Sequence, residues 1–160
     1  MRYIAHQIDR AKWRNTATYR LFPRLQVGIE YNPLADDVHP LANLNILTET
    51  RNRPAVIAGT SSDRIGTPEG QSYYVTVSKD VQRWLRLPVA PYAGVAYGTF
   101  GHKARPIGGI SVRFPAGFSS LVIFDGVKVH PTLTYSKASS AFSLILAHGK
   151  DPGLSYSISF

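Results

Sequence analysis

The last seven residues of the chain place the strongest constraint on its fold. From Leu154 to Phe160, large apolar side chains occupy every even position and serine occupies every odd one. Successive side chains of a β-strand point to opposite faces, so this segment has one apolar face and one face of small hydroxyls. A strand of this kind that ends on an aromatic residue is typical of the closing strand of a β-barrel whose outer surface lies in lipid.

The same alternation recurs along most of the chain, in short runs separated by clusters of Pro, Gly, Asn and Asp. We expect eleven strands, at residues 17–22, 25–31, 41–49, 55–60, 72–79, 89–97, 107–114, 119–124, 127–137, 141–147 and 154–160. Residues 1–15 fit either a first strand or a short amino-terminal helix, because Ile4, Ile8 and Ala11 also have helical spacing. With that segment as a strand the count is about twelve.

These strands predict the all-β class. At 160 residues the chain is long enough for one domain, residues 1–160, and too short for two ordinary ones. The predicted fold is an antiparallel up-and-down transmembrane β-barrel of about twelve strands, with ten as the alternative. A soluble all-β fold has the same alternation with its apolar face inward, so alternation alone does not decide between the two. The aromatic carboxy-terminal residue and the pattern of connections favour the membrane barrel, in which the apolar face points outward.

The predicted connections fall into two classes. Short links are expected at residues 23–24, 51–53, 116–117 and 138–140, with one longer link through Trp84, and all of these lie at the end that carries Phe160. Longer loops at 32–40, 61–71, 98–106 and 148–153, with a tight Asp125-Gly126 hairpin, lie at the opposite end. Outer-membrane barrels have short periplasmic turns and longer external loops, and this pattern agrees with that rule.

Alternation assigns side chains to two faces. The predicted lipid-facing residues are Leu25, Val27, Ile29, Tyr73, Val75, Val77, Leu133, Tyr135, Leu154, Tyr156, Ile158 and Phe160. The predicted lumen-lining residues are Arg20, Glu30, Asn43, Asn45, Glu49, Arg113, Lys128 and His130. In a narrow barrel these charges would pair across the lumen, and in a wider one they would line a path that favours anions.

Composition narrows the function classes. The net charge of +8 comes from scattered basic residues, with no basic run or helical stripe, so we expect no nucleic-acid partner. The chain has no cysteine, and no close pair of histidines suggests a metal site, so we expect neither a metal nor a cofactor. The stretch Met1–Arg10 lacks the apolar core of a signal peptide, so for an exported barrel we expect either a mature or trimmed form or part of a longer precursor.

Four segments resemble known proteins. The tail resembles the carboxy-terminal signal by which bacterial outer-membrane β-barrels are recognised by their assembly machinery. Residues Tyr19–Pro33, Gly59–Pro68 and Ala90–Gly98 resemble a family of small, poorly characterised bacterial outer-membrane barrels. The resemblance implies a barrel in the bacterial outer membrane, with lipids, lipopolysaccharide, the assembly machinery and other envelope proteins as partners. It implies no particular activity.

We therefore expect a passive outer-membrane channel or a structural barrel of the cell envelope, without catalysis. One alternative is a lipid-modifying barrel enzyme, for which His130 with Ser or Thr neighbours and Glu30 is the nearest candidate set. The other is a soluble all-β barrel that binds a ligand. The 98–106 loop offers Lys103 and Arg105 to lipopolysaccharide phosphates.

Overall fold

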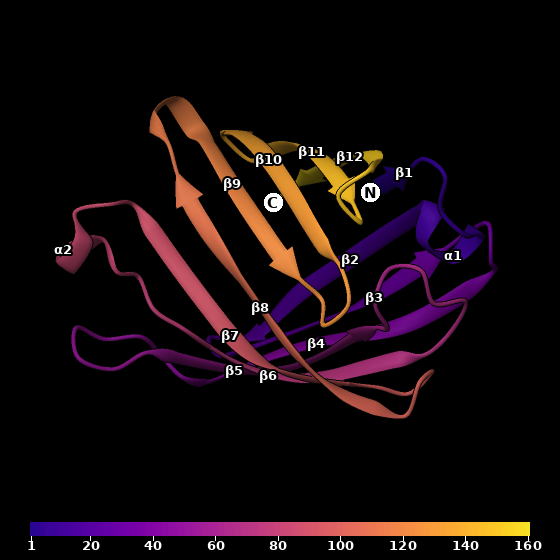
Figure 1. Ribbon diagram of the computed structural model, residues 1–160, viewed down its shortest axis with the longest axis horizontal. Coiled ribbons are helices and arrows are strands. Elements are labelled where there is room, and N and C mark those ends of the chain that lie inside the picture. Colours follow the sequence, from indigo (N-terminus) through magenta and orange to yellow (C-terminus); the bar gives the residue numbers. More distant parts are fainter.

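The computed structural model of residues 1–160 is a closed barrel of twelve antiparallel strands (Figure 1). Each strand pairs with its neighbours in sequence, and β1 joins β2 to β12. The prediction of an all-β, up-and-down barrel is confirmed, with twelve strands rather than ten. The strands are β1 (Arg2–Ile4), β2 (Trp13–Phe22), β3 (Leu25–Asn32), β4 (Asp37–Leu47), β5 (Ala55–Ser62), β6 (Gln71–Ser78), β7 (Val89–Gly98), β8 (Lys103–Arg113), β9 (Phe118–Phe124), β10 (Val129–Lys137), β11 (Ser140–Ala147) and β12 (Asp151–Ile158).

Three short helices lie outside the sheet. Both alternatives for the amino terminus occur in succession, because β1 is followed at once by α1 (Asp9–Lys12). The helix α2 (Gln82–Leu85) lies between β6 and β7, and the 3₁₀ turn η1 (Pro115–Gly117) lies between β8 and β9. No helix is long and apolar enough to cross a bilayer.

The two ends of the barrel are different. The carboxy-terminal end, where β12 finishes, carries the connections 23–24, 48–54, 79–88, 114–117 and 138–139. The plug end carries 5–12, 33–36, 63–70, 99–102, 125–128 and 148–150. We call residues 5–12 and 63–70 together the plug, because they lie across the barrel at this end (Figure 1).

The predicted difference in loop length between the two ends is wrong. The connection 79–88, which contains α2 and Trp84, is the one longer link predicted for the carboxy-terminal end, but it is the longest connection of all. At the plug end β4 starts at Asp37 and β8 at Lys103, so two predicted long loops shrink to residues 33–36 and 99–102. The Asp125-Gly126 hairpin is a four-residue turn in which the Asp125 carboxylate accepts the N–H groups of Val127 and Lys128.

Cross-strand register keeps the apolar side chains on the outer surface. Ile29 of β3 lies opposite Ala17 and Pro40, and Leu133 of β10 lies opposite Ser120 and Leu144. Two bulges occur, between Arg20 and Phe22 and between Asn45 and Leu47. Each adds one residue to its strand, so that two consecutive apolar side chains face outward.

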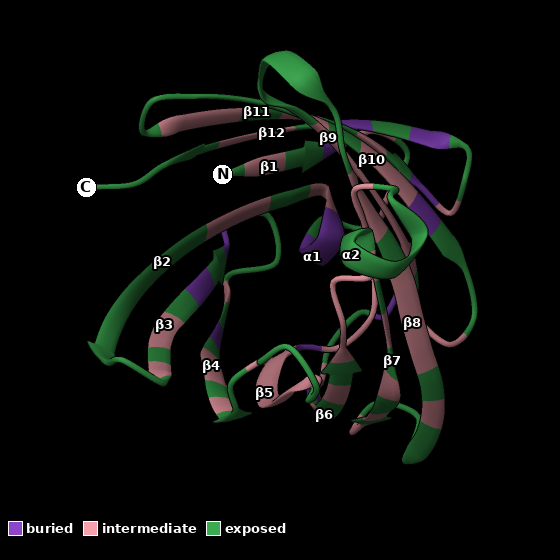
Figure 2. Cartoon of the chain, turned by 90° about the vertical axis from the view of Figure 1, so that its left-hand side faces the viewer, coloured by how far each residue is buried: buried purple, intermediate pink, exposed green.

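The wall has one incompletely paired seam. Because β1 has three residues, only Trp13 and Arg14 of β2 pair with it, and Asn15–Phe22 pair with β3 alone. Figure 2, which looks into the carboxy-terminal end, shows β2 and β12 diverging beyond β1. A pocket of about 240 Å³ opens there, lined by Met1, Arg2, Arg14, Thr16, Ser155, Tyr156 and Ser157.

The seam predicts a local difference in amide hydrogen exchange. Amides of residues 15–22 that point toward the seam have no sheet partner, so we expect them to exchange at least about tenfold faster than the amides of β7, which is paired on both sides. Exchange of the folded protein in detergent, read by mass spectrometry, measures this. Equal protection of the two strands would contradict it.

Candidate functional site

The interior of the barrel is polar. The buried side chains that carry charge or hydrogen-bonding groups are Arg10, Glu30, Asn32, His39, Ser62, Thr67, Ser72, His130 and Asp151. The buried hydrophobic residues are only Ile4, Ala11 and Ala147. Buried charges need partners, so the pairs made inside the barrel define its candidate site.

Glu30 is the centre of the first cluster. It lies on the inward face of β3 and is 1% exposed. Its carboxylate is 2.6 Å from the Arg14 guanidinium and accepts hydrogen bonds from Ser62 at 2.8 Å and Asn32 at 3.1 Å. Arg2 lies directly opposite Arg14 across the β1–β2 pair. The cluster therefore contains one ion pair, Arg14–Glu30, with Arg2 across the strand pair from Arg14.

Arg10 anchors the plug. Its guanidinium donates to the Thr67 carbonyl at 2.6 Å, the Thr67 hydroxyl at 2.6 Å and the Arg64 and Asp63 carbonyls at 2.9 and 3.1 Å. Burial lowers the pKa of Arg10, although the carboxylates of Glu30, Asp63 and Asp37 act in the opposite sense. These contacts hold α1 against the 63–70 loop at this end of the lumen.

Three histidine–aspartate pairs surround the plug. The pairs are His39–Asp37 at 2.6 Å, His130–Asp125 at 2.9 Å and His148–Asp151 at 3.5 Å. His148 also lies 3.3 Å from the Ile65 carbonyl and 3.3 Å from the Gln7 amide, and so it joins both parts of the plug to the β11–β12 turn.

His130 has no free ring nitrogen. Its Nε2 is 2.9 Å from the Asp125 carboxylate, and its Nδ1 accepts the main-chain N–H of His148 at 3.1 Å. Burial raises the pKa of Asp125, but hydrogen bonds from His130 and from the Lys128 and Val127 N–H groups outweigh it and hold that pKa below its usual range. A general base needs a nitrogen that can reach a substrate, so His130 serves as a structural link here.

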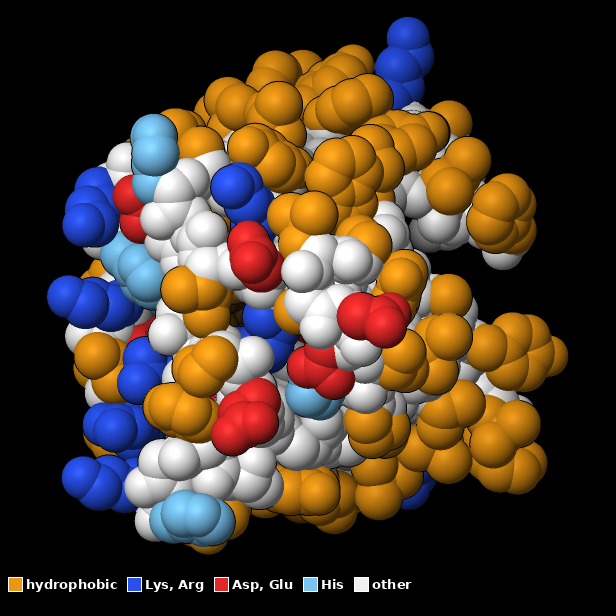
Figure 3. Space-filling model, turned by 90° about the vertical axis from the view of Figure 1, so that its right-hand side faces the viewer, with side chains coloured by type: hydrophobic (Ala, Val, Ile, Leu, Met, Phe, Trp, Pro, Cys, Tyr) orange, Lys and Arg blue, Asp and Glu red, His pale blue; other side chains and the backbone are white.

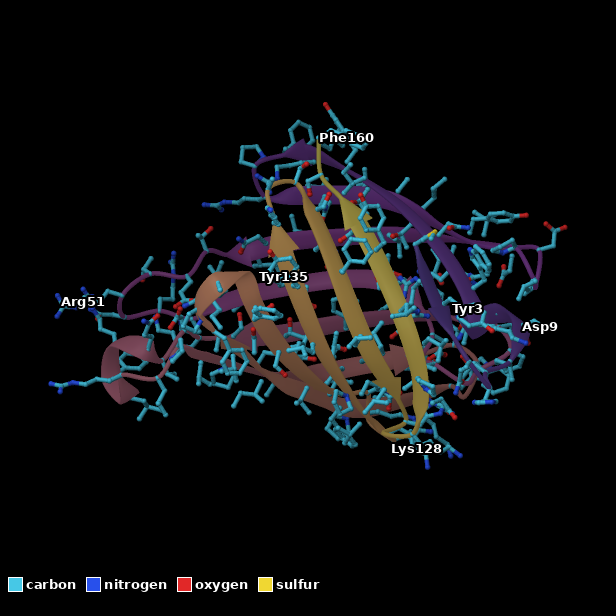
Figure 4. The ribbon with its side chains drawn as sticks, turned by 90° about the horizontal axis from the view of Figure 1, so that it is seen from above. Tyr3, Asp9, Arg51, Lys128, Tyr135 and Phe160 are labelled. Carbon is cyan, nitrogen blue, oxygen red and sulfur yellow. The ribbon has the colours of Figure 1, made fainter.

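The structure places six of the eight predicted lumen residues on the inward face. Glu30, Asn43 and His130 lie well inside, and Asn43 accepts a hydrogen bond from Tyr74 at 2.6 Å. The other three are Asn45, Arg20 and Arg113. Arg20 and Arg113 lie at the carboxy-terminal end of the barrel, which we call the open mouth. Glu49 and Lys128 differ from the prediction, because both lie in connections beyond the strands. Figure 4 shows Lys128 at the tip of its turn, away from the lumen.

Four polar residues of the interior were not predicted from the sequence: Arg2, Arg10, Arg14 and Asn32. Arg14 lay outside the predicted strand, which began at residue 17, whereas β2 begins at Trp13. The alternation of Trp13, Asn15 and Ala17 with Arg14 and Thr16 contains the missing signal, although only weakly, because Asn15 breaks the apolar row.

The twelve residues predicted to face lipid lie on the outer side of the sheet or beyond its end. Ile29, Val75, Leu133 and Leu154 are each more than two-fifths exposed. Leu25, Val27 and Tyr156 are half-buried by their outer neighbours, and Tyr156 packs against Phe142 with ring centroids 4.8 Å apart. Phe160 lies past the end of β12 and is fully exposed (Figure 4).

The net positive charge lies at the carboxy-terminal end. The basic residues there are Arg20, Arg24, Arg51, Arg53, Lys79, Arg83, Arg86, Arg113 and Lys137. The acidic residues there are Glu49 and Asp80, which pair with Lys79 and Arg113. The Gln82 N–H and then Arg113 hold the pKa of Asp80 below its usual range. Seven basic side chains at this end thus have no carboxylate partner.

No group of three or more His, Cys, Asp and Glu side chains is arranged to hold a metal ion.

No family model, curated protein or solved structure matches this chain.

The Glu30 cluster predicts a large loss of stability on removal of its charge. Glu30→Gln leaves the half-buried Arg14 guanidinium without its counter-charge, so we expect the free energy of unfolding to fall by about 3–5 kcal/mol. Urea unfolding in detergent, followed by tryptophan fluorescence, measures it. Glu69→Gln, the same change at an exposed plug-end residue, is the matched control. A loss below about 1 kcal/mol, the size of a surface pair, would contradict the role of Glu30.

Proposed function

We propose that this chain is an integral β-barrel of the bacterial outer membrane, with its lumen closed at the plug end. The observation that carries the proposal is the outer surface. Large apolar side chains are exposed on every strand from β1 to β12 except β5, whereas only three hydrophobic residues are buried. Soluble monomers rarely expose apolar patches larger than a few hundred Å², while a barrel in lipid requires a continuous apolar band.

Aromatic residues border this surface at both ends. Toward the carboxy-terminal end, the outward side chains of Phe118, Tyr135, Phe142 and Tyr156 form one row across β9–β12. Toward the plug end the aromatic side chains are Tyr3, Trp13, Tyr31, Tyr73, Tyr97 and Phe124. Valine, leucine and isoleucine lie between the two groups. Two aromatic girdles around an aliphatic band are characteristic of membrane barrels.

A soluble ligand-binding barrel is less well supported. Such a barrel hides an apolar face in its lumen, whereas here Glu30, Asn32 and His39 are buried inside. Leu133, Val75 and Ile158 lie on the outside. A catalytic barrel is also less well supported, because both ring nitrogens of His130 and the Glu30 carboxylate are held by structural partners.

The basic carboxy-terminal end supports one orientation of the barrel in the membrane, with this end toward the periplasm. Its seven unpaired Arg and Lys side chains suit the anionic headgroups of the periplasmic leaflet, worth about 1 kcal/mol each near such a surface. Barrel-assembly machinery that engages β12 would meet the same end. The plug end would then face outward toward lipopolysaccharide.

The plug argues for a closed barrel rather than an open pore. Arg10 makes four hydrogen bonds to the 63–70 loop, and His148 holds both parts of the plug. Conduction would require α1 or the loop to move, so the passive channel of the sequence prediction becomes a gated one.

A charge placed in the middle of the wall tests the membrane proposal. Leu133 lies midway along β10 and faces outward, so Leu133→Arg in a bilayer should cost about 2–4 kcal/mol of folding free energy. Leu34→Arg, in the exposed 33–36 turn, is the matched control with little expected effect. Urea titration in phospholipid vesicles, with the folded fraction read from gel mobility before and after boiling, measures both. Equal stability of the two variants, or folding of the wild type without detergent or lipid, would overturn the proposal.

A second experiment tests the plug. Arg10→Ala removes the four hydrogen bonds, so we expect frequent channel openings in a planar bilayer where the wild type is almost silent. Lys12→Ala, in the same helix, is the control and should stay silent because its side chain makes none of these bonds. A folded Arg10→Ala barrel that never conducts would show that the plug does not gate the lumen.

A further inference from the structure

A cavity lies beside the plug, between the 63–70 loop and the inner face of β6–β9. Its volume is about 190 Å³. A cavity of about 150 Å³ can hold a benzene ring, so this one has room for a ring and a small headgroup. Ser62 of the Glu30 cluster, Thr67 of the plug and Asp125 of a histidine pair border this space, and the polar groups of these three already have partners.

Small inward residues create the cavity. Ala96 and Gly98 of β7 leave its wall without bulky side chains. The rings of Tyr92 and Tyr74 lie against Gly109 and Gly59, where a Cβ atom would come within 2.6 Å of each ring. Gly98 admits the Asp63 carboxylate, whose Oδ2 accepts the Phe100 N–H at 3.2 Å and so docks the loop on the β7–β8 turn.

The charged groups of the cavity are not balanced. Both of its carboxylates are occupied, Asp63 by the N–H groups of Arg64 and Phe100, and Asp125 by His130 and its own turn. The side chains of Arg64, Lys103 and Arg105 line the same cavity and take part in none of the ion pairs of the molecule. Figure 3, which looks onto the plug end, shows basic side chains gathered along one side of this face.

The rest of the lining is largely apolar. Ile107, Ile123 and the rings of Tyr74 and Tyr92 face the space away from the cationic groups. A ligand that fits must therefore carry a negative headgroup on an apolar body of about one ring. Its headgroup would contact Lys103 and Arg105, and its body would lie over Tyr92.

We propose that this cavity binds a small organic anion, a phosphate or carboxylate on a ring-sized apolar body. The binding site goes beyond the membrane proposal and does not depend on it, because every residue involved faces the inside of the barrel or the plug end. A long-chain lipid with the same headgroup is the alternative source of this chemistry, and it would have to leave its chain outside the cavity.

Three probes distinguish the contribution of the negative headgroup to binding from that of the apolar body. Calorimetric titration of the folded protein in neutral detergent would use phenyl phosphate, inorganic phosphate and benzyl alcohol. We expect phenyl phosphate to bind, inorganic phosphate to bind at least about tenfold more weakly, and benzyl alcohol to give no measurable heat. A lysophosphatidic acid below its micellar concentration tests the long-chain source and should bind no more tightly than phenyl phosphate.

Matched variants test whether the probe binds in this cavity. The double change Lys103→Gln with Arg105→Gln should weaken phenyl phosphate at least about tenfold, while Lys128→Gln, at the same end but outside the cavity, should not. Ala96→Leu fills the cavity and should abolish binding, whereas Ala93→Leu, outward on the same strand, should leave it unchanged. Gel mobility before boiling confirms that each variant is folded.

Several results would overturn the site. If inorganic phosphate bound as tightly as phenyl phosphate, the site would be only a group of cationic side chains, with no pocket for an apolar body. Unchanged affinity in Ala96→Leu would place the probe elsewhere, and tighter binding of the lysolipid would make a lipid the ligand. If Ala96→Leu fails to fold, the double charge variant decides alone. These outcomes are distinct from failure of the membrane proposal, which the Leu133→Arg comparison tests.

Discussion

The structure depends on one constraint, the continuity of side-chain alternation around a closed sheet. Because the period of a strand is two, a slip of one residue in any strand pair would move an apolar row into the lumen and a polar row outward. The registers avoid this around the whole ring, and the two bulges lie where an extra apolar residue must also face out. With almost no apolar core, the fold relies on its backbone ladder and on pairs inside the lumen.

The interior divides into two walls. The wall from β1 to β4 carries Arg2, Arg14, Glu30 and His39, whereas the wall from β5 to β9 carries mostly glycine, alanine, serine and tyrosine. Arg10 links them, since α1 follows β1 and its guanidinium binds the loop between β5 and β6. The plug thus lies between a polar cluster and a cavity, so displacing it would expose both at once.

Much of the fold could be predicted from the sequence because alternation is a local signal. Strands β3, β6, β7 and β10–β12 lie close to their predicted ranges. Pro40 and Pro106 each predict the end of a loop, so the predicted loops 32–40 and 98–106 are longer than the connections 33–36 and 99–102 of the structure. Both prolines sit inside strands on the outer surface, opposite Ile29 and Val95, where each costs the ladder only one donor. The N–H groups of a strand point alternately to its two neighbours, so such a loss is tolerated.

The candidate site was harder to predict because it depends on contacts distant in sequence. Glu30 and His130 could be placed on the inward face by parity, but Ser62 and Arg14 reach Glu30 from other strands. A short amino-terminal helix was one of the two expected alternatives, but its docking as a plug could not be foreseen, because Arg10 finds its acceptors more than fifty residues away. The cavity likewise arises from Gly59 and Gly109, whose effect on Tyr74 and Tyr92 appears only once the register is known.

The formal charge of each end is a poor guide to what an ion would meet there. At the plug end the acidic and basic residues are equal in number, yet both carboxylates that line the cavity are hydrogen-bonded while its three cationic groups are not. At the other end the seven unpaired basic side chains surround the mouth. Charges separated by more than about 8 Å are largely screened at physiological salt where water has access, so each mouth acts on its own surroundings. Glu30, the one carboxylate deep in the wall, is engaged by Arg14, Ser62 and Asn32. An anion therefore meets unpaired cationic side chains both at the open mouth and in the cavity.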